Sequence, residues 1–206
     1  ELSSERFFAE GYVAPDFETY FTLFNPGDDS SEVEFTFMGN DGSSRTFRMT
    51  VPPKCRRTLA AGEQVSGEFS TRVSSSADLA VERLVYARGI EGDLIGATCS
   101  QGQAGLARTR HFAEGYVMPG DFATYYTIGN HDRSPAEVTL TFLTAGGERK
   151  VCRVTVPGSS RYTVDASAFV SGDFSATVES DSDIMVERVV YAGGDGPRRF
   201  MGATVD

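Results

Sequence analysis

The chain has 206 residues and a formal net charge of −10, and hydrophobic residues make up 40% of it. This length and apolar fraction allow one large domain or two small ones, each with its own core. Because the chain is so acidic, it repels nucleic-acid phosphates and anionic lipid surfaces, and we expect no nucleic acid as a partner. No apolar run approaches the roughly 20 residues that span a bilayer, so we expect no membrane insertion.

The first half of the chain contains short apolar runs separated by turn residues. Residues 33–37 alternate apolar and polar side chains, which predicts a strand with one buried and one solvated face. Asn-Asp-Gly at residues 40–42 predicts a hairpin, and residues 78–87 are the longest apolar run of this half. We expect strands within residues 7–9, 20–24, 33–37, 47–51, 69–73, 78–87 and 95–98.

The second half repeats the first. Ala-Glu-Gly-Tyr-Val occurs at residues 9–13 and 113–117, and Val-Glu-Arg-x-Val-Tyr-Ala occurs at residues 81–87 and 186–192. Roughly four in ten aligned positions are identical, and the period is far longer than the 20–50 residues of a solenoid. A small, polar stretch follows residue 99 and marks the boundary that we expect. The expected domains are a first β-sandwich repeat over residues 1–102 and a second over residues 103–206.

The pattern of many short strands without an amphipathic helix predicts an all-β protein. We expect two tandem antiparallel β-sandwich domains that arose by internal duplication. Since duplicated partners often pack through equivalent surfaces, we also expect pseudo-twofold symmetry between them.

Two repeated motifs place charges among apolar neighbours. Glu10 and Glu114 each precede a glycine, which predicts a bulge or a close backbone approach at Gly11 and Gly115. Glu82 and Arg83 are neighbours on a strand, so they point to opposite faces and cannot pair with each other. Buried charges need partners, and the repeat suggests which ones. The structural charge pairs that we expect are Glu10 with Arg83, Arg56 with Glu82, Glu114 with Arg188, and Arg161 with Glu187.

The same charges are ligand-binding candidates if they line a cleft instead of pairing. Tyrosines follow both glutamates in the motif and offer flat rings for stacking. The ligand-binding candidates are Glu10, Tyr12, Arg83, Glu114, Tyr116 and Arg188.

Residues with the usual catalytic chemistry are scarce. His111 and His131 each occur in one copy only, so we expect surface histidines. The acidic turns at residues 27–29 and 181–183 lack the spacing of a calcium loop. The cysteines Cys55, Cys99 and Cys152 are odd in number, so at least one has no partner within the chain. We expect no catalytic residues, no metal site and no cofactor.

Several repeated stretches resemble the sensory rhodopsin transducer family. They are the strand ends at residues 23–25 and 128–130, together with residues 136–142, 154–157 and 172–181. They are also similar to tandem β-modules, domains of unknown function, in bacterial surface or secreted proteins. The resemblance implies a β-sandwich that assembles into oligomers and binds small ligands or carbohydrate. The chain departs from the transducer family by its duplication and at Glu82-Arg83 and Glu187-Arg188, so the surface modules are the closer relatives.

These observations predict a non-enzymatic interaction or structural module of a bacterial envelope or extracellular protein. The alternative is a sensing module for a small ligand, with carbohydrate as the candidate class, and an unrecognised hydrolase comes third. The expected partners are a protein, a small polar ligand or further copies of the chain. The expected location is extracellular or the cell envelope, with the cytoplasm as the alternative. Because the chain begins at Glu1 rather than Met, we expect a piece of a longer protein.

Overall fold

The computed structural model describes residues 1–89, 91–193 and 200–204, the last of these as backbone only. Within this part the chain is all-β, with two antiparallel strand systems and two short 3₁₀ turns. The first system, here the first domain, consists of β1 (Ser3–Phe8), β2 (Tyr12–Val13), β3 (Phe17–Phe24), β4 (Ser31–Gly39), β5 (Ser44–Val51), β6 (Arg56–Ala60), β7 (Gly67–Arg88) and β8 (Leu94–Ser100). The second domain consists of β9 (Ala107–Phe112), β10 (Tyr116–Val117), β11 (Phe122–Asn130), β12 (Ala136–Thr144), β13 (Arg149–Val156), β14 (Ser160–Asp165), β15 (Gly172–Ala192) and β16 (Phe200–Thr204). The 3₁₀ turns are Ala61–Glu63 and Ala166–Ala168.

One long strand organises each domain. The strands of the first domain follow the order β5-β4-β7-β3-β6, and β1, β2 and β8 also pair with β7. The N-terminal part of β7 pairs with β4 up to Ser75, and its C-terminal part pairs with β3 from Ala80 onward. The second domain has the same order, β13-β12-β15-β11-β14, around β15. A single strand therefore contributes to both layers of each sandwich.

The alternating patterns read from the sequence correspond to buried and solvated faces. In β4, Val33, Phe35 and Phe37 are buried, and Phe35 and Phe37 stack beside Phe21 in the core of the first domain. The second domain has its own core around Tyr126 and Phe142. Each domain therefore buries its own set of apolar side chains, as expected for tandem sandwiches.

Turn residues occur where the sequence predicts them. The hairpin between β4 and β5 contains Gly42 with φ of +79°, a left-handed conformation that glycine adopts without strain.

Cys55, Cys99 and Cys152 are all free thiols.

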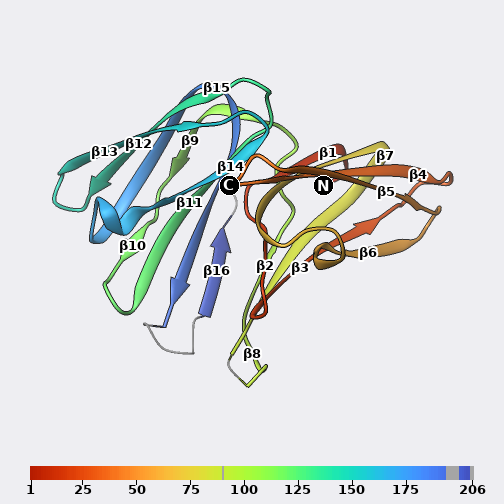
Figure 1. Ribbon diagram of the computed structural model, residues 1–206, viewed down its shortest axis with the longest axis horizontal. Coiled ribbons are helices and arrows are strands. Elements are labelled where there is room, and N and C mark those ends of the chain that lie inside the picture. Colours follow the sequence, from red (N-terminus) through yellow and green to blue (C-terminus); the bar gives the residue numbers. More distant parts are fainter. Residues whose placement is uncertain (90, 194–199, 205–206) are drawn as a thin grey trace.

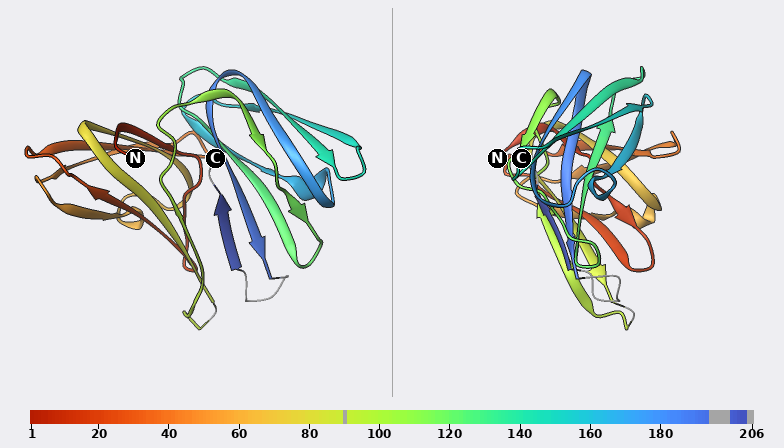
Figure 2. Two further views of the ribbon diagram at one scale, coloured as in Figure 1. Left: turned by 180° about the vertical axis from the view of Figure 1, so that it is seen from behind. Right: turned by 90° about the vertical axis from the view of Figure 1, so that its left-hand side faces the viewer.

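The two domains lie side by side, and their equivalent strands β8 and β16 contact each other at the junction (Figures 1 and 2). The first strand system ends at Ser100 and the second begins at Ala107, and the expected boundary after residue 102 lies between them. Gln103 in this connection pairs with Phe7 through two backbone hydrogen bonds, which fixes the connecting segment against the end of β1.

Candidate functional site

The first copy of the Ala-Glu-Gly-Tyr motif, residues 9–12, lies at the junction between the domains. Its glycine is required by packing, because a Cβ on Gly11 would lie 2.4 Å from the ring of Phe69. The carbonyl of Gly11 also accepts a hydrogen bond from the amide of Phe69 at 2.9 Å. The expected close backbone approach is confirmed, and it occurs again between Gly115 and Phe174. This contact holds the preceding residue, Glu10, at the edge of the first domain.

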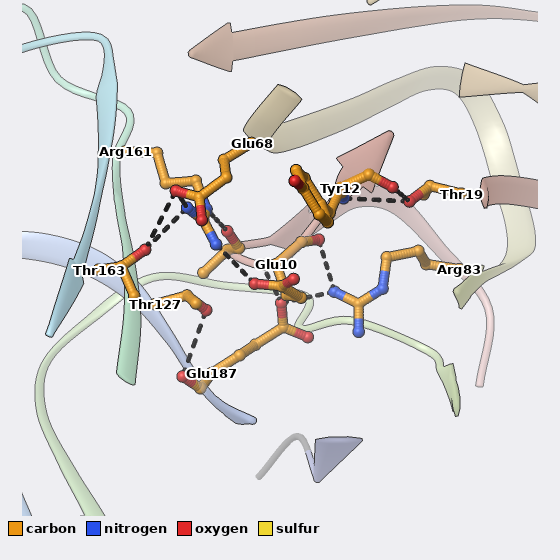
Figure 3. Close-up of polar contacts among 10 residues, drawn as sticks. Glu10, Tyr12, Thr19, Glu68, Arg83, Thr127, Arg161, Thr163 and Glu187 are labelled. Atoms are coloured by element: carbon orange, nitrogen blue, oxygen red, sulfur yellow. Dashed lines mark hydrogen bonds and ion pairs between the residues drawn. The ribbon is translucent and has the colours of Figure 1, made fainter. Parts of the chain in front are cut away.

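Glu10 is 4% exposed, and its carboxylate binds an arginine of the second domain. Nη2 of Arg161 lies 2.6 Å from Oε2 of Glu10, and Nε of Arg161 donates to the carbonyl of Ala9 at 3.0 Å. Nη1 of the same guanidinium contacts Glu68, a residue of β7 (Figure 3). One guanidinium of the second domain therefore occupies a socket of three acceptors in the first domain. Burial by itself lowers the pKa of Arg161, and the carboxylates of Glu10 and Glu68 raise it by more, so it is charged.

A second charge pair crosses the junction in the opposite direction. Nη1 of Arg83 in the first domain lies 2.6 Å from Oε2 of Glu187 in the second, and both side chains are fully buried. The same nitrogen donates to the carbonyl of Glu10 at 2.7 Å, and Glu187 accepts from the backbone amide of Glu10 (Figure 3). The backbone and side chain of Glu10 thus join both ion pairs into one network.

The structure changes most of the charge pairs expected from the sequence. Arg83 contacts the backbone carbonyl of Glu10 instead of its carboxylate, and Glu187 pairs with Arg83 instead of Arg161. The reason is that each of these charges is bound by a side chain of the other domain. Glu10 and Arg83 of the first domain are paired with side chains of the second domain. The sequence of a single repeat does not contain this information.

The expected pair of Arg56 with Glu82 is absent, and neither residue forms an ion pair within the described parts of the chain. The two residues lie on β6 and β7, and β3 runs between these strands. Two strand spacings separate them by about 10 Å, which is too far for a direct ion pair. In contrast, the expected pair of Arg188 and Glu114 is present, with a distance of 2.8 Å between Nη1 and Oε2.

The polar contacts at the junction are heterologous. A twofold arrangement would pair Arg56 with Glu114 and Glu82 with Arg188, repeating the two observed interdomain pairs. Instead Arg56 is exposed, Glu82 is half-buried, and the side chain of Glu114 is 60% exposed. Among the described residues, the interdomain ion pairs are Arg83 with Glu187 and Arg161 with Glu10 and Glu68, and they do not follow pseudo-twofold symmetry.

Apolar side chains surround the charge network. Val85 and Val189 pack together across the junction, and Phe7 and Ala9 pack against Met185. Phe7 also meets the ring of His131 edge-on, with 5.1 Å between the ring centroids. His131 is therefore not the surface residue that we expected. Burial of its ring, with a smaller effect of Arg72, lowers its pKa to about 4.

A pocket with a volume of about 320 Å³ opens beside the network. Aromatic rings and polar groups from both domains surround it. The lining residues are Glu10, Tyr12, Asp16, Phe17, Glu68, Tyr125, Thr127, Arg161, Thr163, Val189 and Tyr191. Burial, with a smaller contribution from Glu10, strongly raises the pKa of Tyr191, so its hydroxyl keeps its proton and can donate a hydrogen bond.

Of the ligand candidates, Glu10 and Tyr12 line this pocket. Glu114 lines a separate hollow of about 350 Å³ on the second domain. Arg83, Tyr116 and Arg188 line neither. The ligand candidates did not include Glu68 or Tyr191, which also line the pocket, although an acidic residue occurs at both equivalent positions, Glu68 and Asp173.

The described residues contain no group of three or more His, Cys, Asp or Glu side chains arranged to hold a metal ion. Within the same residues, no helix has the length and apolarity needed to cross a membrane.

No known family model matches the chain, and no curated protein shows significant sequence similarity to it. Solved structures with a similar fold include the Thermotoga maritima protein 1070, which is 18% identical, with 48% of this chain and 91% of that protein aligned and a TM-score of 0.44. The Anabaena sensory rhodopsin transducer is 24% identical, with 38% and 78% aligned and a TM-score of 0.36. The tandem CBM22 domains of Paenibacillus barcinonensis Xyn10C are 10% identical, with 94% and 80% aligned and a TM-score of 0.26.

Proposed function

We propose that the protein is a non-enzymatic β-sandwich binding module of a bacterial envelope or extracellular protein, and that it binds a small polar ligand in the interdomain pocket. The observation that carries this proposal is the lining of the pocket. Tyr12, Phe17, Tyr125 and Tyr191 surround it together with carboxylates, threonines and a guanidinium. Pockets of this volume at domain junctions, with a few polar groups among aromatic rings, are common ligand sites.

The ligand class that fits this lining is a neutral sugar. The tyrosine rings offer apolar faces, and the hydroxyl and carboxylate groups offer the donors and acceptors that sugar hydroxyls need. The pocket is rigid on one side, because Arg161 is fixed by Glu10, Glu68 and the carbonyl of Ala9. Both Glu10 and Glu68 are engaged by this guanidinium, so neither is a free carboxyl group for acid–base chemistry.

The test is a thermal-shift screen with neutral mono- and disaccharides, followed by calorimetric titration of each hit. Binding at one hundred times Kd stabilises the fold by about 2.7 kcal/mol. Tyr125→Ala is expected to weaken binding at least about tenfold, because it removes one aromatic wall of the pocket. Its matched control is Tyr20→Ala, the equivalent position in the first domain, which does not line the pocket. A screen in which no saccharide raises the melting temperature, or an equal loss of binding in both variants, would overturn the proposal.

A purely structural role is the second candidate. It is supported by the burial of Arg83 and Glu187, which pair across the junction between the two domains. In that case the protein is a rigid two-domain spacer, and the saccharide screen gives no hit.

A further inference from the structure

The junction joins a sheet face of the second domain to the three-acceptor socket of the first domain. Within the described residues, the equivalent sheet face of the first domain and the equivalent socket of the second domain take no part in it. The second domain uses a sheet face, here called the arginine face, to cover the first domain. Its residues are Tyr125, Thr127, Arg161, Thr163, Glu187 and Tyr191. The equivalent arginine face of the first domain carries identical residue types at Tyr20, Thr22, Arg56, Thr58, Glu82 and Tyr86.

Strand register places these residues on one face. Thr127 pairs with both Thr163 and Glu187, and Thr22 pairs with both Thr58 and Glu82. Directly paired residues of antiparallel strands point to the same side. In the second domain this face is covered, with Arg161 2% exposed and Glu187 fully buried. In the first domain Arg56 and Thr58 are exposed and Glu82 is half-buried.

The complementary surface is also present twice. In the first domain, Arg161 enters the socket formed by the carbonyl of Ala9 and the carboxylates of Glu10 and Glu68. The equivalent residues of the second domain are Ala113, Glu114 and Asp173. All three are exposed, and all three line the hollow of about 350 Å³.

We propose that the open socket of the second domain binds the arginine face of a second copy of this chain, with Arg56 of that copy between Glu114 and Asp173. Charge complementarity and continuity with the observed junction support this occupant, since Arg56 and Asp173 form no ion pair within the described residues. Leu143, which is 44% exposed, lies at the same hollow and is covered in the assembly.

The contact is heterologous, so it closes into a ring of two chains or continues as an open chain, depending on the rotation between copies. The contact between two copies is more widely spaced than the junction within the chain at one position. In the junction within the chain, Gly129 lies against Ser70, and a Cβ added to this glycine would be 3.1 Å from the Cβ of the serine. The first domain has Phe24 at the equivalent position, 45% exposed, so the two faces meet at a wider spacing beside Arg56.

Sedimentation equilibrium and light scattering of the whole chain test the proposal. The wild type is expected to associate, either to a defined two-chain mass or to a mass that grows with concentration. Arg56→Glu and Asp173→Arg are each expected to weaken association on the order of 30-fold, as for removal of one partner of an interfacial charge pair. The matched control is Arg57→Glu, which makes the same charge change on the neighbouring residue of β6, whose side chain points to the opposite face.

Charge reversal provides the decisive comparison. A chain carrying both R56E and D173R, or an equimolar mixture of the two single variants, is expected to recover association, because the new carboxylate on β6 of one copy then meets the new guanidinium on β15 of the other. Circular dichroism of each variant confirms that it is folded. A monomeric wild type at all concentrations, equal loss with Arg57→Glu, or no recovery by charge reversal would overturn the proposal. Neither Arg56 nor Asp173 lines the interdomain pocket. Substitutions at these residues therefore test association without changing the saccharide site, and the two proposals can be overturned separately.

Discussion

Arg83 of the first domain and Glu187 of the second form an ion pair, 2.6 Å between Nη1 and Oε2, from which solvent is fully excluded. Nε and Nη2 of Arg83 and Oε1 of Glu187 are buried without a hydrogen-bond partner among the described residues. A buried pair with this much unsatisfied hydrogen bonding offsets its desolvation cost only in part. Its main effect is to specify how the domains meet, because either charge alone in this position is strongly unfavourable.

The first prediction concerns this pair. Glu187→Gln is expected to lower the free energy of unfolding by about 3–5 kcal/mol, because it leaves the Arg83 guanidinium buried without a counter-charge. The double variant Arg83→Met, Glu187→Met is expected to recover most of that loss, since it leaves no unpaired charge. Urea unfolding followed by circular dichroism measures both.

The control is Glu82→Gln, the equivalent substitution in the first domain. Glu82 is half-buried and forms no ion pair with a described residue, so a change within about 0.5 kcal/mol is expected. Equal losses for the two glutamates would contradict a special role for the interdomain pair.

The second prediction concerns the cooperativity of the two domains. The wild type is expected to unfold in one calorimetric transition, because the charge network and the contact between Val85 and Val189 couple the domains. Arg161→Met leaves Glu10 buried and unpaired, and two separate transitions are expected. Arg56→Met, the same substitution at the exposed equivalent, should leave the single transition unchanged at concentrations where the chain is monomeric. Two transitions in the wild type would show that the junction does not couple the domains.

The third prediction concerns the glycines of the repeated motif. Gly11→Ala and Gly115→Ala place a methyl group 2.4 Å from the rings of Phe69 and Phe174. Each is expected to cost about 1–3 kcal/mol of stability, as is typical of overpacking. Gly105→Ala serves as the control, since no atom lies within 4 Å of its Cβ position. A neutral effect at Gly11 would mean that the Phe69 ring moves aside at little cost.

The fourth prediction concerns pH. The native pKa of His131 is about 4, whereas an unfolded histidine has a pKa near 6.5. Between these values the unfolded chain binds a proton that the native form does not, so stability falls as pH decreases from about 6.5 to about 4. Protonation of His131 in the unfolded chain lowers the free energy of unfolding by up to about 3 kcal/mol.

His131→Phe keeps an aromatic ring against Phe7 and removes the titration. The difference in unfolding free energy between this variant and the wild type is expected to change with pH only in that window, while contributions from the carboxylates cancel. A constant difference from pH 4 to pH 7 would show that the ring is not excluded from solvent as the structure indicates.

Much of the architecture follows from local pattern. Alternation in residues 33–37 predicts the buried and solvated faces of β4, and the glycines before Tyr12 and Tyr116 predict a close backbone approach. The first feature depends on the two-residue period of a strand, and the second depends on the absence of a Cβ on glycine. Both are properties of a few neighbouring residues. Repetition of the same pattern then indicates two domains of one fold.

The partners of the charges depend on the tertiary structure. The Ala-Glu-Gly-Tyr motif occurs twice with nearly the same surroundings, yet Glu10 is buried against Arg161 and Glu114 is largely exposed beside Arg188. Within one repeat, both glutamates look alike, because the sequence carries no local record of which domain face covers which socket. That choice is made by packing between residues about 150 positions apart, where a heterologous junction satisfies one set of repeated charges and leaves the other at the surface.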